Sequence, residues 1–302
     1  MSTATLPYRS FSSFLAEHFP GEKVQKITLT AGFSCPTRDG SRGKGGCTYC
    51  NNKSFSPNYA AKQRSITEQL DEGIRFFSRK YPAMKYLAYF QSYTNTYGAV
   101  EDCIAKYEEA LAHPGVVGLI IGTRPDCMPE PLLDYLSALA RRRFVLIEYG
   151  VESTLDRSLD RIQRGHSWAE SVETIERTHR AGIMVGAHII LGLPGESREE
   201  LLSHADRLGT LPLTTLKIHQ LQIIKGTLMA GEYLRQPEDF HLFTEEEYIA
   251  LCVDFVRRLP RGLVIERFVS QSPPELLLAP RWGWKNFEFT AKIERALLEA
   301  EP

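Results

Sequence analysis

Residues 183–200 read IMVGAHIILGLPGESREE, and this stretch contains a strand followed by the start of a helix. The run Ile183–Leu191 is nearly continuous in apolar residues, which is typical of strands covered on both faces. Ser197 and Glu200 have the spacing of a capping box, in which a hydroxyl and a carboxylate three residues later bind free amide groups at a helix start. The stretch therefore predicts one strand–helix unit.

The same pattern recurs along most of the chain. Further apolar runs are Val24–Thr30, Lys85–Gln91, Val116–Gly122, Phe144–Gly150 and Thr215–Ile224. Capping boxes also begin at Ser65, Ser167 and Thr244, and helical periodicity covers Ser65–Tyr81 and Pro129–Arg142. Strands that alternate with helices predict right-handed βαβ units and a parallel sheet, hence an α/β fold. Six such units fit a partly closed barrel or an open doubly wound sheet, and the pattern allows both.

Residues 24–240 contain the six units, and two extensions flank them. Residues 1–23 are expected to form an N-terminal helical extension. Residues 241–302 are expected to form a C-terminal α/β extension with a helix, a seventh strand at Leu263–Val269 and a last helix near Phe287–Glu299. Functional groups of parallel α/β folds lie at the carboxyl ends of the strands, so the long connection Thr30–Ser65 is expected there.

The composition is that of an ordinary globular protein of 302 residues. Lys plus Arg number 36 and Asp plus Glu number 37, so the net charge neither favours nor excludes a nucleic-acid partner. Met1–Ser10 lacks the features of a signal peptide, and no apolar run approaches the ~20 residues of a membrane helix. Six cysteines without a secretion signal favour a reducing compartment, and we expect a cytoplasmic protein.

Three of the cysteines lie in the long first connection, which reads CPTRDGSRGKGGCTYC over residues 35–50. Two residues separate Cys47 from Cys50, so both thiolates can reach one metal centre, and thiolates select zinc or iron–sulfur clusters. A structural zinc site needs four ligands, but no Cys or His lies between Cys50 and Cys103, and the nearest one upstream is His18. Three ligands fit a four-iron cluster with one open iron, with zinc and a redox disulfide as the alternatives.

This segment resembles the cluster loop of the radical S-adenosylmethionine (SAM) superfamily, and residues 33–51 resemble the YhcC/YtqA-like proteins closely. Most members of the superfamily have three residues between the first two cysteines. This chain has eleven, a long gap found in a subset that includes the elongator-type tRNA wobble-uridine enzymes. The resemblance implies a partial (β/α)6 TIM-type barrel with the two extensions. It also implies a [4Fe–4S] cluster on Cys35, Cys47 and Cys50, with Tyr49 near the adenine of SAM.

The resemblance further implies a reaction. A reduced cluster cleaves SAM to methionine and a 5′-deoxyadenosyl radical, which abstracts hydrogen from a substrate carbon. A reductant protein such as a flavodoxin or ferredoxin would be a partner. The wobble uridine of tRNA is the first candidate substrate and a small metabolite or tetrapyrrole the second. A non-catalytic metal- or RNA-binding scaffold is the alternative from another class.

The ends of the second and third predicted strands supply further candidates. Other members of the superfamily often have a group here that binds the amino group of the methionine part of SAM. In this chain Ser92, Thr94 or Asn95 would take that role, with a plain polar turn as the alternative. Cys127 is a candidate hydrogen donor to a substrate radical, although a buried structural role is the commoner fate of a cysteine.

The fourth and fifth strands end in groups that the resemblance relates to SAM. Glu148 or Glu152 would bind ribose hydroxyls or lie near the sulfonium, unless it pairs with Arg161 or Arg164. Arg164 would bind the cofactor carboxylate, with a solvated loop arginine as the alternative. Gly192 and Pro194 would lie against the adenine, unless they form an ordinary turn. His188 and His219 fall on strands and are candidates to line the barrel.

Two sets of side chains suit RNA, each with a plain structural alternative. The phosphate-binding candidates are Arg38, Arg42 and Lys44 in the cluster loop and Arg141, Arg142 and Arg143 after the third helix. The base-stacking candidates are Tyr93, Tyr97, Trp282 and Trp284. Solvated charges and packed aromatic rings are the alternatives.

Overall fold

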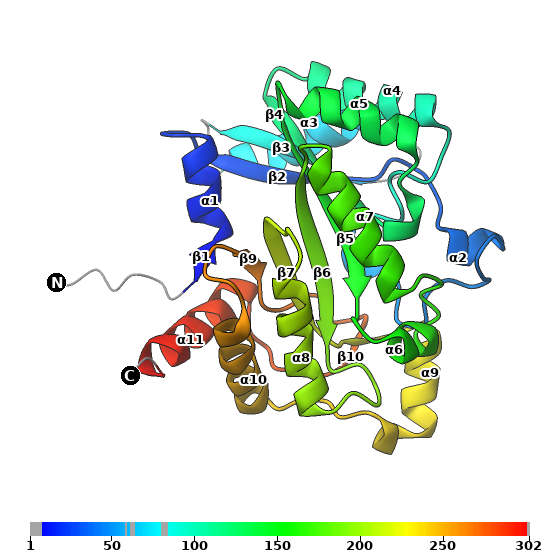
Figure 1. The fold of residues 1–302 in the computed structure, drawn as a ribbon, viewed down its shortest axis with the longest axis vertical. Helices are drawn as coiled ribbons and strands as arrows, with labels where there is room; N and C mark the ends of the chain where they lie inside the picture. The colour runs from blue at the N-terminus through cyan, green and yellow to red at the C-terminus, as the bar shows by residue number, and fades with distance from the viewer. Residues whose placement is uncertain (1–7, 58, 61–63, 80–83, 301–302) are drawn as a thin grey trace.

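The computed structural model describes residues 8–57, 59–60, 64–79 and 84–300, and in this part of the chain eight strands form one parallel sheet (Figure 1). The order across the sheet is β2-β3-β4-β5-β6-β7-β9-β1. Its strands are β1 (Arg9–Ser10), β2 (Val24–Leu29), β3 (Lys85–Phe90), β4 (Val116–Thr123), β5 (Phe144–Glu152), β6 (Met184–Leu191), β7 (Thr215–Gln220) and β9 (Val264–Arg267). The sheet curls into a half-barrel, so the predicted partial barrel is confirmed and the open sheet is wrong.

Helices cover the outer face of the curled sheet (Figure 1). The helices that pack on this face are α3 (Ile66–Ser78), α4 (Val100–Ala112), α5 (Glu130–Ala140), α7 (Trp168–Arg180), α8 (Arg198–Gly209), α10 (Glu245–Arg258) and α11 (Asn286–Glu299). The other helices are α1 (Phe11–His18), α2 (Pro36–Asp39), α6 (Asp156–Arg161) and α9 (Leu228–Arg235). In the described part of the chain, no helix is long and apolar enough to span a membrane.

The capping boxes predicted from the sequence are present at the starts of α3, α7, α8 and α10. In each, the hydroxyl accepts a hydrogen bond from the amide three residues later, and the glutamate accepts one from the cap residue. The predicted end of the first helix at Tyr81 lies outside the described residues. The helix predicted over Pro129–Arg142 is observed as α5.

Two of the predicted boundaries differ from the structure. The run Thr215–Ile224 is not one strand, because it divides into β7 and the short β8 (Ile223–Ile224), which pairs antiparallel with β10 (Leu277–Ala279). The seventh strand expected at Leu263–Val269 is observed as β9, and it lies between β7 and β1 in the main sheet. Segments from both extensions therefore continue the barrel sheet.

The interior of the half-barrel is apolar at the amino ends of the strands. Phe14 and Leu15 of α1 form a buried cluster with Phe144, the first residue of β5, and Val264, the first residue of β9. Leu87, Tyr89, Ile120 and Leu146 complete this cluster. Helix α1 therefore closes the inside of the barrel at its amino end, which leaves the carboxyl ends as the place for a site.

Candidate functional site

The carboxyl ends of the strands surround a cavity of about 210 Å³. Its lining includes Thr123 at the end of β4, Glu152 at the end of β5 and Gln220 at the end of β7. Cys35, Cys47 and Cys50 all line this cavity, as the predicted cluster loop requires. All three are free cysteines.

The long gap between Cys35 and Cys47 folds back on itself. The amide of Gly46 donates to the carbonyl of Thr37 at 2.8 Å, and Gly46 has a φ of +88°, a conformation that favours glycine. The amide of Cys50 donates to the carbonyl of Cys47 at 3.0 Å in a tight turn. These local bonds return the chain to the cavity, so cysteines twelve residues apart face the same space.

Each of the three sulfurs lies within reach of a polar side chain. The hydroxyl of Thr94 donates to Sγ of Cys35 at 3.1 Å, the guanidinium of Arg164 to Sγ of Cys47 at 3.6 Å, and the amide of Asn52 to Sγ of Cys50 at 3.8 Å. Hydrogen bonds to sulfur stabilise thiolates that ligate a metal. The residues present therefore fit a thiolate-bound group.

Two of these thiols, Cys35 and Cys50, are unsuited to ionise by themselves. Burial raises the pKa of Cys50 to about 11, and it also raises the pKa of Cys35. A metal centre supplies the positive charge that deprotonates such a thiol. As they stand, no three or more Cys, His, Asp or Glu side chains of the described residues are gathered closely enough to hold a metal ion. Three thiols around one cavity match the three-cysteine set expected for a [4Fe–4S] cluster.

Arg164 is buried beside the cysteines, so the alternative of a solvated loop arginine is wrong. Its guanidinium donates to the carbonyl of Gly150 at 2.6 Å and lies 3.5 Å from the carboxylate of Glu152. The ion pair that the sequence analysis gave as the alternative for Glu148 or Glu152 is therefore present for Glu152.

Tyr49 also lines the cavity, and burial and the nearby Glu152 raise its pKa well above the usual range. The cofactor-binding roles of Tyr49, Glu152 and Arg164 stay predictions.

Glu148 lines the same cavity, but its carboxylate already has cationic partners. It lies 2.5 Å from the ammonium of Lys217, 3.2 Å from that of Lys26 and 3.1 Å from the ring of His188. Neither Arg161 nor Arg164 pairs with it, since Arg161 binds Glu232. A contact of Glu148 with SAM stays a prediction, and the structure adds that this carboxylate anchors a buried ion network.

The polar turn after β3 contributes one of its three candidates to the cavity. Thr94 lines it and binds Cys35. Ser92 is bound to Ser56 at 2.6 Å, and the Asn95 amide donates to two backbone carbonyls at the ends of β3 and β4. Ser92 and Asn95 lie outside the lining, so the structure brings only Thr94 together with the cysteines.

Three other candidates also lie away from the cavity. Gly192 and Pro194 are buried outside its lining, and a side chain at position 192 would meet the ring of Phe243. Cys127 lines a separate depression with Arg42, and burial raises the pKa of its thiol to about 12. Their predicted roles gain no support from these positions.

Several cavity residues were not among the sequence candidates. Arg267 lines the cavity at the end of β9, and its guanidinium forms no hydrogen bond or ion pair with the described residues. Gln220, Gln222, Ser270, Gln271 and Ser272 also line it. The available signal was the predicted strand Leu263–Val269, because residues that follow a barrel strand belong to the site end. His188 and His219, which the sequence placed on strands, do line the cavity.

Comparison with known proteins agrees with this geometry. The profile of the radical SAM superfamily matches residues 40–208, and that of the radical SAM C-terminal domain matches residues 213–299. The chain belongs to the radical SAM superfamily. Radical SAM enzymes use a [4Fe–4S] cluster and SAM, and they generally need a reductant.

Radical SAM relatives match over much of the length. Protein YhcC of Escherichia coli K12 is 36% identical over 280 residues, which are 92% of this chain and 89% of the relative. A tRNA uridine(34) acetyltransferase of Methanocaldococcus infernus is 26% identical over 180 residues, 57% of this chain and 32% of that enzyme. The solved structure of Elp3 from M. infernus, with an N-terminal deletion, has a TM-score of 0.69 at 18% identity. The match covers 92% of this chain and 63% of the Elp3 chain, which shows a shared fold.

Proposed function

We propose that this radical SAM enzyme modifies the wobble uridine of tRNA. The observation that carries the proposal is the similarity to a tRNA uridine(34) acetyltransferase over 57% of the chain. The eleven-residue gap between Cys35 and Cys47, which resembles that of elongator-type enzymes, supports the same substrate class.

In this proposal Cys35, Cys47 and Cys50 hold the cluster. When bound, the cluster supplies the electron that cleaves SAM. Arg164 donates a hydrogen bond to the sulfur of Cys47 and orients it. Thr94 and Asn52 orient the other two sulfurs through hydrogen bonds. The apolar cluster under α1 keeps water from the amino side of the site, which protects reactive species.

The proposal requires an electron donor. We infer a small reductant protein of the flavodoxin or ferredoxin type, because the electron must come from outside the chain. A tRNA substrate and six free cysteines support a location in the cytoplasm.

Comparing the nucleosides of tRNA from a strain that lacks the gene with those of the parent strain tests the substrate. We expect one modified uridine to disappear and a precursor to accumulate. A plasmid that encodes the wild-type protein should restore the profile, whereas one that encodes Cys47→Ala should not. Liquid chromatography with mass spectrometry measures both nucleosides.

Two results would contradict the proposal in different ways. Identical tRNA profiles would remove tRNA as the substrate and leave a small molecule as the target. Cleavage of SAM at the wild-type rate by anaerobically reconstituted Cys47→Ala protein would refute the ligand assignment, because a cluster without this thiolate should not support the reaction.

A further inference from the structure

The cluster cavity adjoins a groove in the C-terminal part of the chain. This groove has a volume of about 450 Å³ and follows the segment between β10 and α11. The residues that line both the cavity and the groove are Gln220, Gln222, Ser270, Gln271 and Ser272. A ligand that lies in the groove therefore borders the same polar wall as a group in the cavity.

This shared wall is held in place by hydrogen bonds between β7 and the chain after β9. The amide of Gln220 donates to the carbonyl of Ser270 at 3.1 Å, and the Ser270 amide donates to the Gln220 side chain at 2.6 Å. The amide of Gln222 donates to the same carbonyl at 3.1 Å and accepts from the Ser272 hydroxyl at 2.7 Å. The wall is thus preorganised for a ligand.

The outer part of the groove combines positive charge with an exposed indole. Arg281 and Lys285 are exposed, and the groove lining contains no Asp or Glu among the described residues. Trp284 is 43% exposed, and its ring is fixed because its indole N–H donates to Glu245 at 2.5 Å. Trp282 instead stacks on Phe289, with ring centroids 5.1 Å apart. The ammonium of Lys292 lies 3.8 Å from the centroid of the Trp284 ring, so a base can stack only on the other face of this ring. Trp282 supports the groove from inside.

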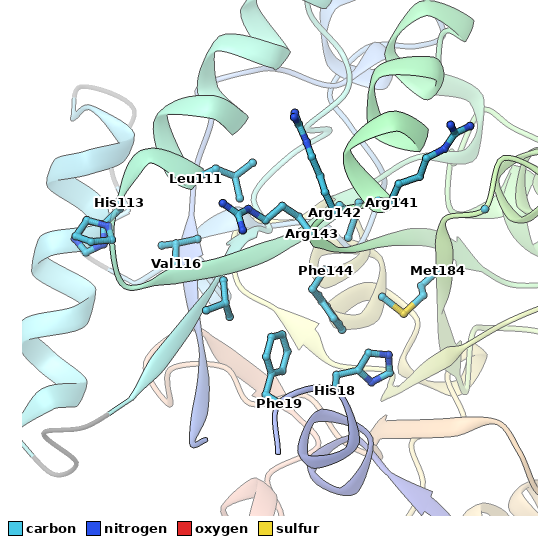
Figure 2. Close-up of a pocket in the computed structure, with 15 residues that line it drawn as sticks. His18, Phe19, Leu111, His113, Val116, Arg141, Arg142, Arg143, Phe144 and Met184 are labelled. Carbon is cyan, nitrogen blue, oxygen red and sulfur yellow. The ribbon is translucent and has the colours of Figure 1, made fainter. Parts of the chain in front are cut away.

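A larger depression with more arginines lies at the opposite end of the sheet. It has a volume of about 830 Å³ and is lined by Arg141, Arg142 and Arg143 together with His18 and Phe19 (Figure 2). These arginines directly precede β5, whose far end at Glu152 lines the cluster cavity. A strand of nine residues spans roughly 30 Å, so these arginines cannot contact a group in the cavity. The predicted contact of this triplet with tRNA phosphates stays a prediction, and it would lie far from the reacting group.

We propose that the groove is the path by which a single-stranded RNA loop enters the cluster cavity. Arg281 and Lys285 contact its phosphates, and a base stacks on Trp284. The target uridine passes Gln220 and Gln222 into the cavity. This inference rests on the proposed tRNA function and identifies the surface that performs it. Stacking on an aromatic ring and backbone contacts from cations are the usual means of binding unpaired RNA.

Binding measurements on the anaerobically reconstituted protein with SAM test the groove. The probes are total tRNA from the deletion strain and a short fluorescent oligouridine. We expect Trp284→Ala to weaken binding about fivefold or more, and Trp284→Phe to restore most of it. The double variant Arg281→Gln/Lys285→Gln should reduce the salt dependence of log K by about 0.7 for each lost phosphate contact.

The triple variant Arg141→Gln/Arg142→Gln/Arg143→Gln is the matched control, since it removes more charge from the other end. We expect its RNA affinity to equal that of the wild type. Iron content and melting temperature exclude misfolding in every variant. Wild-type RNA affinity in the groove variants, or a greater loss of affinity in the triple variant, would contradict the proposal that RNA binds in the groove. Neither result would contradict tRNA as the substrate. Failure of the wild-type protein to bind either RNA would also contradict RNA binding in the groove. The nucleoside profiles would then show separately whether tRNA is the substrate.

Discussion

At the residue scale, the buried charges under the cavity depend on two carboxylates, Glu148 and Glu266. Glu148 is 1% exposed and contacts Lys217, Lys26 and His188, which come from three other strands. Burial lowers the pKa of Lys217 to about 8, although Glu148 and Glu266 act in the opposite direction. Lys217 therefore remains charged at neutral pH, and its stability in the core depends on these carboxylates.

Replacing Glu148 with Gln should lower the free energy of unfolding by about 3–5 kcal/mol at pH 7, because the buried ammonium of Lys217 and the partly buried ammonium of Lys26 lose a partner. Burial alone would raise the pKa of Glu148, but Lys217, Lys26 and His188 hold it well below its usual value of 4.5. Stability from this group is therefore complete above about pH 4.5 and is lost as the pH falls through the lowered folded-state pKa. Urea unfolding of wild type and variant should accordingly show a difference that shrinks in acid.

The exposed pair of Glu199 and Arg258 provides the control for Glu148. Glu199→Gln should change the free energy of unfolding by less than about 1 kcal/mol, as is usual for surface ion pairs. Equal stability of Glu148→Gln and wild type at pH 7 would show that the network does not depend on this carboxylate.

A second feature at the residue scale is Gly150, which leaves room for the side chain of Arg164. A methyl group on Gly150 would lie 2.5 Å from the Arg164 guanidinium and 2.6 Å from the Glu152 carboxylate. Gly150→Ala should therefore displace Arg164. Since Arg164 is predicted to bind the cofactor carboxylate, this displacement should weaken SAM binding about tenfold or more, the effect of one charged hydrogen bond. Gly262→Ala, with nothing within 4 Å, is the control in equilibrium dialysis with labelled SAM. An unchanged affinity of Gly150→Ala for SAM would mean that SAM binding does not depend on the present position of Arg164.

At the element scale, the helices on the outside of the sheet begin at local signals. The capping box of α8 is representative, since the Glu200 amide donates to the Ser197 hydroxyl at 3.3 Å and the Ser197 amide donates to the Glu200 carboxylate at 2.9 Å. Both partners lie within one turn of helix. Such a start requires no distant part of the chain.

Removing this cap should lower stability without affecting the site. Ser197→Ala is expected to lower the free energy of unfolding by about 1 kcal/mol. Ser197→Asp should retain most of the stabilisation that the cap provides, because aspartate also caps helices. Urea unfolding followed by circular dichroism measures both. An equal loss in the two variants would show that the hydroxyl does not act as a cap.

At the scale of the whole molecule, both ends of the chain complete the barrel. β9 pairs with β7 on one side and with β1 on the other. Helix α10 contributes Tyr248, Leu251 and Phe255 to the main core, and Phe289 of α11 joins them. The residues after 240, which the sequence analysis described as a C-terminal extension, thus share one core with the barrel.

A chain that ends at residue 240 should consequently fail to fold. It would lack β9, leave β7 as an unpaired edge and expose the core face covered by α10. We expect insoluble protein, or soluble protein without a cooperative thermal transition by circular dichroism. A cooperatively folded fragment would instead establish residues 241–302 as a separable domain.

The sequence alone determined the strand–helix alternation, the four helix caps and the cysteine spacing, because apolar periodicity, caps and turns act over a few residues. The tertiary structure alone decided which distant groups meet. It paired Glu148 with Lys26 and Lys217, buried Arg164 beside Cys47, and placed Cys127 and Arg141–Arg143 away from the cavity. These relations depend on how the sheet curls and on which strands become neighbours. Both are set by long-range packing, which residue spacing along the chain does not encode.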